Sequence, residues 1–189
     1  MTHPTDRWVC YDRGMSETPS LPHPACLAPE QLLGECDQTF TRRSGPGGQN
    51  RNKVETAVVL RHRPTGCEAE ANERRTQGEN RREALHRLRV LLAMEVRTTP
   101  ERFRNVSPTP LWRSRCRGGR LQINPAHDDF PCLLAEALDA IAEAEFDPKP
   151  AAQHLGCSPT QLIKLIQHES RALVWWNARR LDRGLHRLH

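Results

Sequence analysis

The chain has 189 residues and a formal net charge of +5 at pH 7, so it can hold one domain or two small ones. The basic balance favours a nucleic-acid partner. No run of 18 apolar residues occurs, which excludes a membrane-spanning helix, and the N-terminus lacks the apolar core of a signal peptide, so we expect a cytoplasmic protein.

The chain begins with a loop-forming segment and continues into a small mixed domain. Residues 1–28 are rich in Pro, Ser, Thr and His and show no periodicity, which is typical of a disordered leader. We expect a first domain over 29–97. It starts with a helical turn at 29–34 and a strand at 36–43, where β-branched and aromatic residues favour extended backbone.

A glycine-rich segment, Ser44-Gly45-Pro46-Gly47-Gly48-Gln49, follows the predicted strand. Glycine loses the most backbone entropy in regular structure, so this segment is a loop. Its basic flanks are Arg42, Arg43, Arg51 and Lys53. Glycines permit close backbone approach and basic side chains neutralise phosphates, so the loop suits a narrow polyanionic cavity. A solvated basic face is the alternative for the flanks.

A β-hairpin and a long helix complete this domain. Residues 57–62 and 67–71 are expected to pair around a turn at 63–66, which contains Pro and Gly. Apolar residues then recur at helical spacing from about 73 to 96. Arginines line one side of this helix at intervals of seven residues, at Arg75, Arg82 and Arg89. They are candidates for phosphate contact, and a solvated face paired with neighbouring acids is the alternative.

Residues 98–130 are rich in Pro, Gly and Arg, which predicts a basic connector with little regular structure. Within it, Arg113, Arg115, Arg117 and Arg120 flank Trp112. An aromatic ring among arginines suits RNA, by stacking and by charge. Packing of Trp112 on the preceding domain is the alternative.

Residues 131–189 predict a small all-α domain. Its segment 149–167 has the offsets of a helix-turn-helix unit, with Gly156 in the turn, Ser158 as N-cap of the second helix and Gln161 closing a capping box. The second helix carries little net charge, so we favour a packing or docking module over a reader of DNA sequence. The basic residues after 170 are either an RNA-binding tail or the exposed side of a last helix.

Several motifs within 36–97, about a third of the chain, stand in a diagnostic order. Gly-Pro-Gly-Gly-Gln-x-x-Asn-Lys at 45–53 is followed by Pro-Thr-Gly at 64–66 and Arg-Thr-Gln-x-x-Asn at 75–80. This order resembles the catalytic GGQ domain of class I peptide-chain release factors and of the short, stop-codon-independent ribosome-rescue hydrolases, which are closest in size. The resulting fold class is α+β: a small GGQ domain of strand, loop, β-hairpin and long helix, followed by the small helical domain.

The resemblance implies a peptidyl-tRNA hydrolase that acts on the ester within the ribosome, with Gly47, Gly48 and Gln49 as catalytic residues. The backbone N–H of Gln49 would stabilise the developing oxyanion and its side chain would orient water. The partners are then large-subunit rRNA and P-site peptidyl-tRNA, bound by a monomer. We expect neither metal nor cofactor, since the seven cysteines and nine histidines lack zinc-ligand spacing.

Nothing before Cys36 is large enough to read a stop codon, so we expect codon-independent release from stalled ribosomes. A non-catalytic ribosome-binding factor and a helix-turn-helix DNA regulator are the alternatives. The intact Gly-Gly-Gln tip weighs against a non-catalytic factor, and the small net charge of the second helix weighs against a DNA regulator. The expected RNA contacts are Arg42, Arg43, Arg51, Lys53, Arg75, Arg82, Arg89, Arg113, Arg115 and Arg117.

Overall fold

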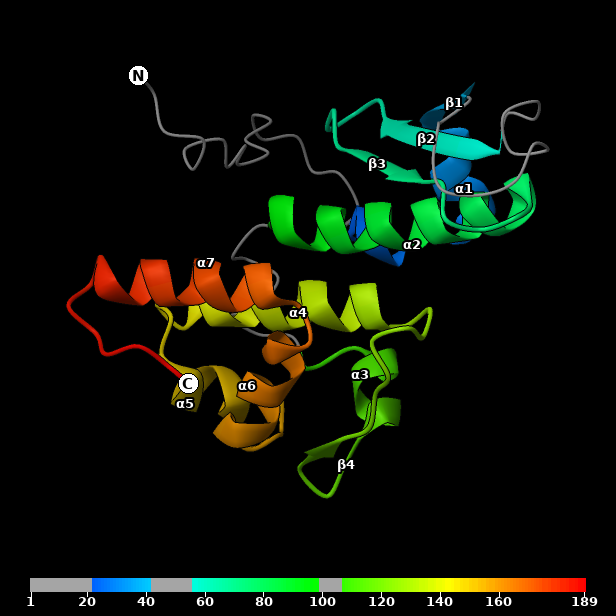
Figure 1. The fold of residues 1–189 in the computed structure, drawn as a ribbon. Coiled ribbons are helices and arrows are strands. Elements are labelled where there is room, and N and C mark those ends of the chain that lie inside the picture. The colour runs from blue at the N-terminus through cyan, green and yellow to red at the C-terminus, as the bar shows by residue number, and fades with distance from the viewer. Residues whose placement is uncertain (1–21, 42–55, 99–106) are drawn as a thin grey trace, which may run out of the picture. The chain divides into compact units, whose positions relative to one another are not determined.

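The computed structural model describes residues 22–41, 56–98 and 107–189, and combines small sheets with several helices (Figure 1). This mixture agrees with the expected α+β class. The chain divides into two compact units, one formed by residues 20–92 and the other built on residues 93–189. Each unit is described by itself below.

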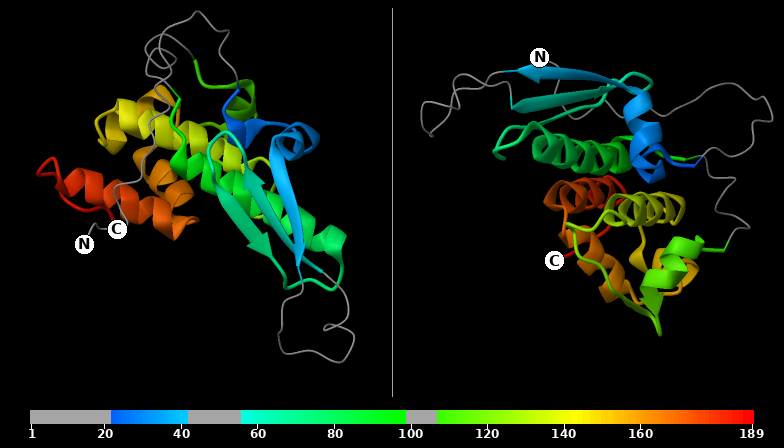
Figure 2. Two further views of the ribbon diagram at one scale, coloured as in Figure 1. Left: turned by 90° about the horizontal axis from the view of Figure 1, so that it is seen from above. Right: turned by 90° about the vertical axis from the view of Figure 1, so that its right-hand side faces the viewer.

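The first unit is a three-stranded antiparallel sheet with a long helix along one face (Figure 2). The strands follow the order β1-β2-β3, with β1 at Cys36–Thr41, β2 at Ala57–His62 and β3 at Glu68–Ala71. The helix is α2 (Gln77–Glu95), and a 3-10 turn η1 (Pro24–Cys26) and a short helix α1 (Pro29–Gly34) precede the sheet. The sequence predicted each of these elements except η1.

The central strand β2 positions the core of this unit. Val58 and Leu60 are fully buried and His62 nearly so, whereas Arg61 is exposed on the other face. Residues directly opposite each other in a sheet share a face, and Phe40 and Ala71 are the partners of Val58. One face of all three strands is therefore directed inward.

Helix α2 covers the inward face of the sheet through apolar packing and side-chain bonds to both outer strands. Arg81 Nε donates to Oε1 of Gln38 on β1 at 2.9 Å, and Arg87 Nη1 donates to the carbonyl of Glu70 on β3 at 2.8 Å. The apolar face predicted for this helix is buried, at Leu85, Leu88 and Leu92.

Residues 22–28, which we expected to belong to a disordered leader, are part of the first unit. Ala25 is fully buried, and its N–H donates to Nδ1 of His23 at 3.0 Å. Its carbonyl accepts a 2.9 Å bond from Nε of Arg89 on α2. The chain is thus fixed to the helix by a charge-assisted hydrogen bond, which composition alone does not reveal.

Among its described residues, the second unit consists of helices and one two-stranded hairpin. The helices are α3 (Pro110–Arg115), α4 (Phe130–Glu143), α5 (Pro148–His154), α6 (Pro159–Gln167) and α7 (Ser170–Leu181). The hairpin pairs β4 (Cys116–Arg117) with β5 (Arg120–Leu121). Helix α4 is buried along most of its length, and α5 and α6 both pack on it.

Trp112 and Trp176 are the largest fully buried side chains of this unit. The indole Nε1 of Trp112 donates to the carbonyl of Leu155 at 2.7 Å, and that of Trp176 to the carbonyl of Phe146 at 3.0 Å. Trp112 is therefore a core residue of the second unit and cannot stack on RNA bases. Because Trp112 lies on α3, this helix and the hairpin that follows it belong to the second unit. We had expected a connector with little regular structure over 98–130.

The predicted turn lies between α5 and α6, with Gly156 at a φ of 66°. The Ser158 side chain accepts from the N–H of Gln161 at 3.3 Å, as expected of an N-cap. The Gln161 side chain does not close a capping box: its Oε1 accepts from the N–H of Leu121 at 3.2 Å. The hairpin is thus joined to the start of α6, and the helix-turn-helix character of this unit stays a prediction.

The basic residues near the C-terminus do not form one exposed surface. Arg180 is 8% exposed, and it donates to the carbonyls of Phe146 at 2.6 Å and His186 at 2.8 Å. Asn177 on α7 exchanges two hydrogen bonds with the backbone of Leu188, at 2.7 and 3.0 Å. The segment after α7 is therefore tied back to that helix.

Candidate functional site

The glycine-rich segment connects β1 to β2. The candidate catalytic and basic residues of this segment lie outside the described residues: Gly47, Gly48, Gln49, Arg42, Arg43, Arg51 and Lys53. Thr41, the last residue of β1, is the register partner of Ala57, the first residue of β2. Paired residues of antiparallel strands have Cα atoms about 4.5–5.5 Å apart. The segment therefore leaves and re-enters the sheet at one point.

Asn80 holds the returning end of this segment. Its side chain is fully buried, and its Nδ2 donates to the carbonyls of Thr56 at 2.7 Å and Arg74 at 3.1 Å. Its Oδ1 accepts from the N–H of Arg74 at 2.8 Å. One amide thus joins the residue before β2, the turn before α2 and α2 itself.

A complete capping box begins α2 beside this amide. The N–H of Glu79 donates to Oγ1 of Thr76 at 3.2 Å, and the Glu79 carboxylate accepts from the Thr76 hydroxyl at 2.7 Å and the Thr76 N–H at 3.3 Å. These bonds from Thr76, together with Arg74 and Arg82 nearby, lower the pKa of Glu79. The Arg-Thr-Gln-x-x-Asn motif therefore supplies both the cap of α2 and the anchor of the loop.

Residues 33–110 match the family described as the RF-1 domain. The chain is 44% identical over 82 residues to peptide chain release factor PrfB1, chloroplastic, of Arabidopsis thaliana. It is 48% identical over 67 residues to peptide chain release factor 1 of Leuconostoc citreum, and 52% identical over 69 residues to that of Streptococcus agalactiae. The sequence of residues 33–110 is therefore class I release factor-like. Since most of these residues belong to the first unit, we call that unit the release factor-like domain.

The alignments with release factors cover only part of each chain. The three alignments cover 39%, 35% and 34% of this chain and 18%, 18% and 19% of the relatives. The chain therefore spans less than a fifth of the length of these relatives. The family match ends at residue 110, so most of the second unit lies outside it.

The structure separates the three arginines that the sequence placed along one side of α2. Arg75 and Arg82, in the release factor-like domain, are exposed. Arg89 is only 8% exposed and donates to the carbonyl of Ala25. Arg89 therefore fixes the N-terminal turn, and only Arg75 and Arg82 stay available as phosphate contacts.

The arginines of the second unit differ in the same way. Arg113 and Arg117 are exposed. Arg115 is paired with Asp129, to which its Nε donates at 2.9 Å. Arg120, next to the hairpin turn and outside our predicted set, is also exposed. Arg120 lies opposite Arg117 because a two-residue turn, Gly118-Gly119, joins the two strands. This pair of glycines is the sequence feature from which the hairpin could have been predicted.

The Pro-Thr-Gly motif forms the turn that the sequence predicted at 63–66, and side-chain bonds that the sequence did not reveal hold this turn in place. His62 is 1% exposed, and its Nδ1 lies 2.7 Å from Oγ1 of Thr65 while its Nε2 lies 2.9 Å from Oε2 of Glu35. The Thr65 hydroxyl also accepts from the N–H of Cys67 at 3.3 Å. This motif fixes the β2–β3 turn, at the opposite end of β2 from the loop.

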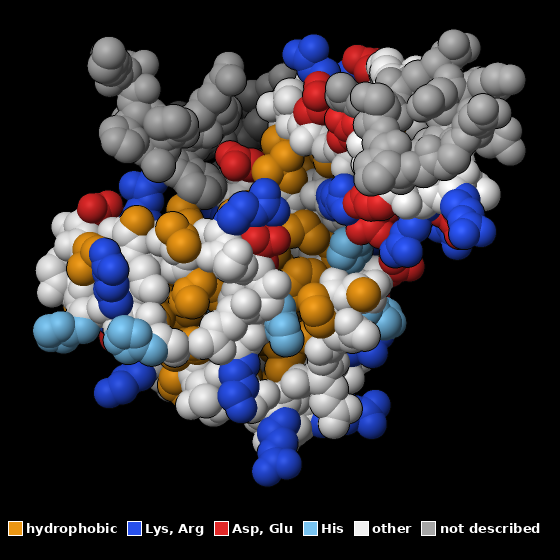
Figure 3. Space-filling view, viewed as in Figure 1, with side chains coloured by type: hydrophobic (Ala, Val, Ile, Leu, Met, Phe, Trp, Pro, Cys, Tyr) orange, Lys and Arg blue, Asp and Glu red, His pale blue; other side chains and the backbone are white. Residues whose placement is uncertain are grey.

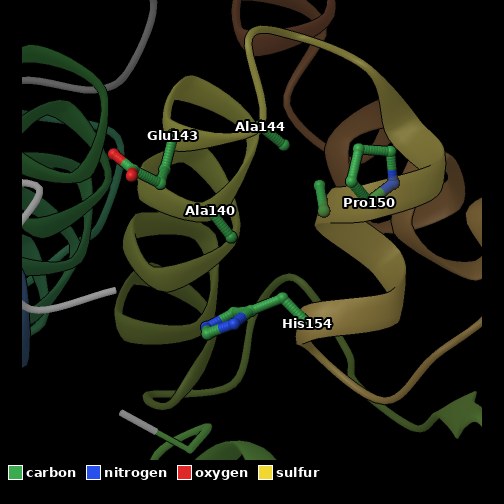
Figure 4. A pocket seen from close by; sticks show the side chains of 6 residues that line it. Ala140, Glu143, Ala144, Pro150 and His154 are labelled. Atoms are coloured by element: carbon green, nitrogen blue, oxygen red, sulfur yellow. The ribbon is translucent and has the colours of Figure 1, made fainter. Parts of the chain in front are cut away.

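A pocket of about 200 Å³ lies between α4 and α5 in the second unit (Figure 4). Three alanines and Pro150 line it, and Glu143 and His154 stand at its edges. Across the three described ranges, no cluster of His, Cys, Asp or Glu is suited to hold a metal ion. Nor is any helix in those ranges long and apolar enough to span a membrane.

Proposed function

We propose that this protein hydrolyses the peptidyl-tRNA ester on the ribosome and so releases the nascent chain. The observation that carries this proposal is the Gly47-Gly48-Gln49 sequence within residues 33–110, which match the RF-1 domain, in a chain that is up to 54% identical to release factors over the aligned residues. The described ends of the loop support it, since β-pairing at Thr41 and the Asn80 amide at Thr56 fix where the loop leaves the domain.

The proposed chemistry needs few protein groups. The ester is already activated relative to an amide, so the reaction requires a positioned water and stabilisation of the carbonyl oxygen as it gains negative charge. A preorganised backbone N–H meets the second need, and by resemblance to release factors we assign it to Gln49. Gly47 and Gly48 give the backbone the freedom to present that N–H. The Gln49 side chain then orients the water.

The proposed partners are large-subunit rRNA and P-site peptidyl-tRNA, met by a monomer in the cytoplasm. Arg42, Arg43, Arg51 and Lys53 flank the loop and are proposed to contact RNA phosphates, with Arg75 and Arg82 extending this surface along the start of α2. All but the last two lie outside the described residues.

We further propose that release is independent of the codon in the A site. The Gly-Gly-Gln tip lies within residues 33–110, which match the RF-1 domain, and the alignments with the relatives leave more than four fifths of each relative unmatched. Outside the matched residues, the described part of this chain forms a small unit of helices and a hairpin, in which the residues that follow α7 are tied back to that helix.

The test is a peptide-release assay. Ribosomes with labelled peptidyl-tRNA in the P site would receive the purified protein with an empty, a sense or a stop codon in the A site, and with Gly48→Ala as the control. We expect release in all three states and its loss in the variant. Release with stop codons alone would overturn codon independence. Ribosome binding without release in any state would instead indicate a non-catalytic factor.

A further inference from the structure

The hairpin of the second unit places two arginines directly opposite each other. Arg117 on β4 and Arg120 on β5 are register partners, so their side chains share one face of the hairpin. The turn between them is Gly118-Gly119, with φ of 56° and 73°. Positive φ at both turn positions is the requirement of a type I′ turn, which fixes this pairing. Both arginines are exposed.

This arrangement is electrostatically unfavourable for the isolated protein. Like charges directly opposite each other destabilise a strand pair. Among the described residues, no carboxylate pairs with Arg117 or Arg120. Arg115, only two residues from Arg117, is by contrast neutralised by Asp129. The hairpin therefore keeps two uncompensated positive charges in contact with solvent, where an external anion can neutralise them.

Two more exposed basic residues extend this charge. Arg113 lies on α3, directly before the hairpin, and Lys164 lies on α6. Lys164 is one helical turn after Gln161, whose side chain accepts from the N–H of Leu121 on β5. We name the set of Arg113, Arg117, Arg120 and Lys164 the basic hairpin face. Figure 3 shows Lys and Arg side chains without Asp or Glu beside them at the lower end of the second unit, where β4 lies in Figure 1.

We propose that the basic hairpin face binds the phosphate backbone of helical RNA, without reading its sequence. Single-stranded RNA is typically held by exposed aromatic rings, on which bases stack. The exposed large apolar side chains of the described residues are Phe40, Val174 and Leu181, none of which belongs to this face. A row of fixed cations without a stacking platform matches phosphates held at regular spacing in a duplex.

The same geometry disfavours a sequence-reading contact with DNA. A recognition helix uses its N-terminal residues to reach base edges in the major groove. At the start of α6 these residues are engaged by the hairpin: the Ser158 N–H donates to the Gly119 carbonyl at 3.4 Å, and Gln161 accepts from Leu121. The choice of RNA over DNA as the natural duplex rests on the proposed function at the ribosome.

The proposal is tested by binding of the full chain to a labelled RNA duplex of about 20 base pairs, followed by fluorescence anisotropy at several salt concentrations. The test variant is Arg117→Ala/Arg120→Ala, and the matched control is Lys149→Ala/Arg187→Ala, which removes the same charge from exposed positions elsewhere in this unit. We expect the test variant to bind the duplex about tenfold more weakly than the wild-type protein. The slope of the logarithm of the association constant against the logarithm of the salt concentration should become less steep by about 2. The control is expected to lose much less.

A single substitution separates binding from folding. Arg120→Glu places a carboxylate opposite Arg117, so the hairpin gains a favourable cross-strand pair. We expect the melting temperature to stay constant or rise while duplex affinity falls. Equal loss of affinity in the control variant, or unchanged affinity in Arg120→Glu, would overturn the proposal. A clear preference for a DNA duplex of the same sequence would also overturn it.

The outcome is independent of peptide release. Gly48→Ala lies outside the basic hairpin face, so this variant should bind the duplex like the wild-type protein. A wild-type protein that binds the duplex but releases no peptide would contradict the proposed function alone. Release without any duplex binding would contradict the RNA contact alone.

Discussion

The side chain of Asn80 on α2 donates a hydrogen bond to the carbonyl oxygen of Thr56, 2.7 Å away. Thr56 is the first described residue after the Gly-Gly-Gln segment, and Asn80 is fully buried. The same side chain exchanges two bonds with the backbone of Arg74. The position at which the loop re-enters the domain is thus fixed by one amide of the long helix.

Replacing Asn80 by Ala should destabilise the release factor-like domain by about 2–3 kcal/mol, because three backbone groups lose a buried partner. Urea unfolding, followed by circular dichroism, measures this loss. Asn124→Ala is the matched control, since that side chain accepts one local bond in an exposed turn. A difference below about 0.5 kcal/mol between the two variants would contradict the anchoring role of Asn80.

Replacing Gly48 by Ala should abolish most of the peptide release. An added Cβ restricts the backbone beside Gln49, whose N–H is proposed to stabilise the oxyanion. Loss of one such donor costs about 2.7–4 kcal/mol of barrier, or about 10²–10³ in rate. Single-turnover release at saturating protein measures the rate, and sedimentation with ribosomes measures binding. Full release by this variant would refute the catalytic assignment of the loop.

Arg82 and Arg89 lie two helical turns apart and are expected to respond differently to substitution by Ala. Arg89→Ala removes a buried, charge-assisted bond to Ala25 and should lower the free energy of unfolding by about 2 kcal/mol. Arg82→Ala, at an exposed position, should leave stability within about 0.5 kcal/mol and weaken ribosome binding. Unfolding and ribosome sedimentation of both variants form one matched experiment. The reverse pattern would contradict both assignments.

Asp139 on α4 should make stability depend on pH. Burial raises its pKa from 3.8 to about 6, against the opposing effect of Arg97, 3.6 Å away, and hydrogen bonds from Thr98. Between pH 4 and 6 the folded protein therefore holds a proton that the unfolded chain has lost. Stability from this group is greatest below pH 4 and falls as pH rises to 6, by on the order of 2–3 kcal/mol.

Comparison of the wild-type protein with Asp139→Asn isolates this effect from the other carboxylates. The difference in unfolding free energy between the two should change with pH from 4 to 6 and be constant above pH 7. Asp128→Asn, at an exposed position, serves as the control and should show no such change. A difference that is independent of pH would show that Asp139 titrates at its ordinary value.

The sequence predicted the first unit well because its signals are local. The aliphatic run in residues 57–62 predicted β2, and the helical spacing of Leu85, Leu88 and Leu92 indicated the buried face of α2. The bonds of Asn80 and His62 could not be predicted, since each joins segments whose proximity depends on the finished fold. The order of the motifs showed the resemblance to release factors, and the turn at 63–66 was predicted, but the side-chain bonds that hold these motifs in place were not.

The second unit was harder to predict because its order depends on distant partners. Trp112 gives the same local signal in a core and on an RNA-binding surface, and only its bond to Leu155 decides between them. The positive φ of Phe146, 66°, is uncommon outside glycine and had no sequence signal. Gly118-Gly119 is typical of a hairpin turn, but the arginines around it led us to predict a basic connector instead.

The pairing of Thr41 with Ala57 has a consequence for how this domain can diversify. The entropy of closing a loop grows with the logarithm of its length, by about 0.6 kcal/mol for each doubling, so insertions between the two strands would cost the fold little. Within β2 the opposite holds, because a shift of one residue would turn Val58 and Leu60 outward. The length of the loop between β1 and β2 can therefore change during evolution while the pairing of the two strands stays constant.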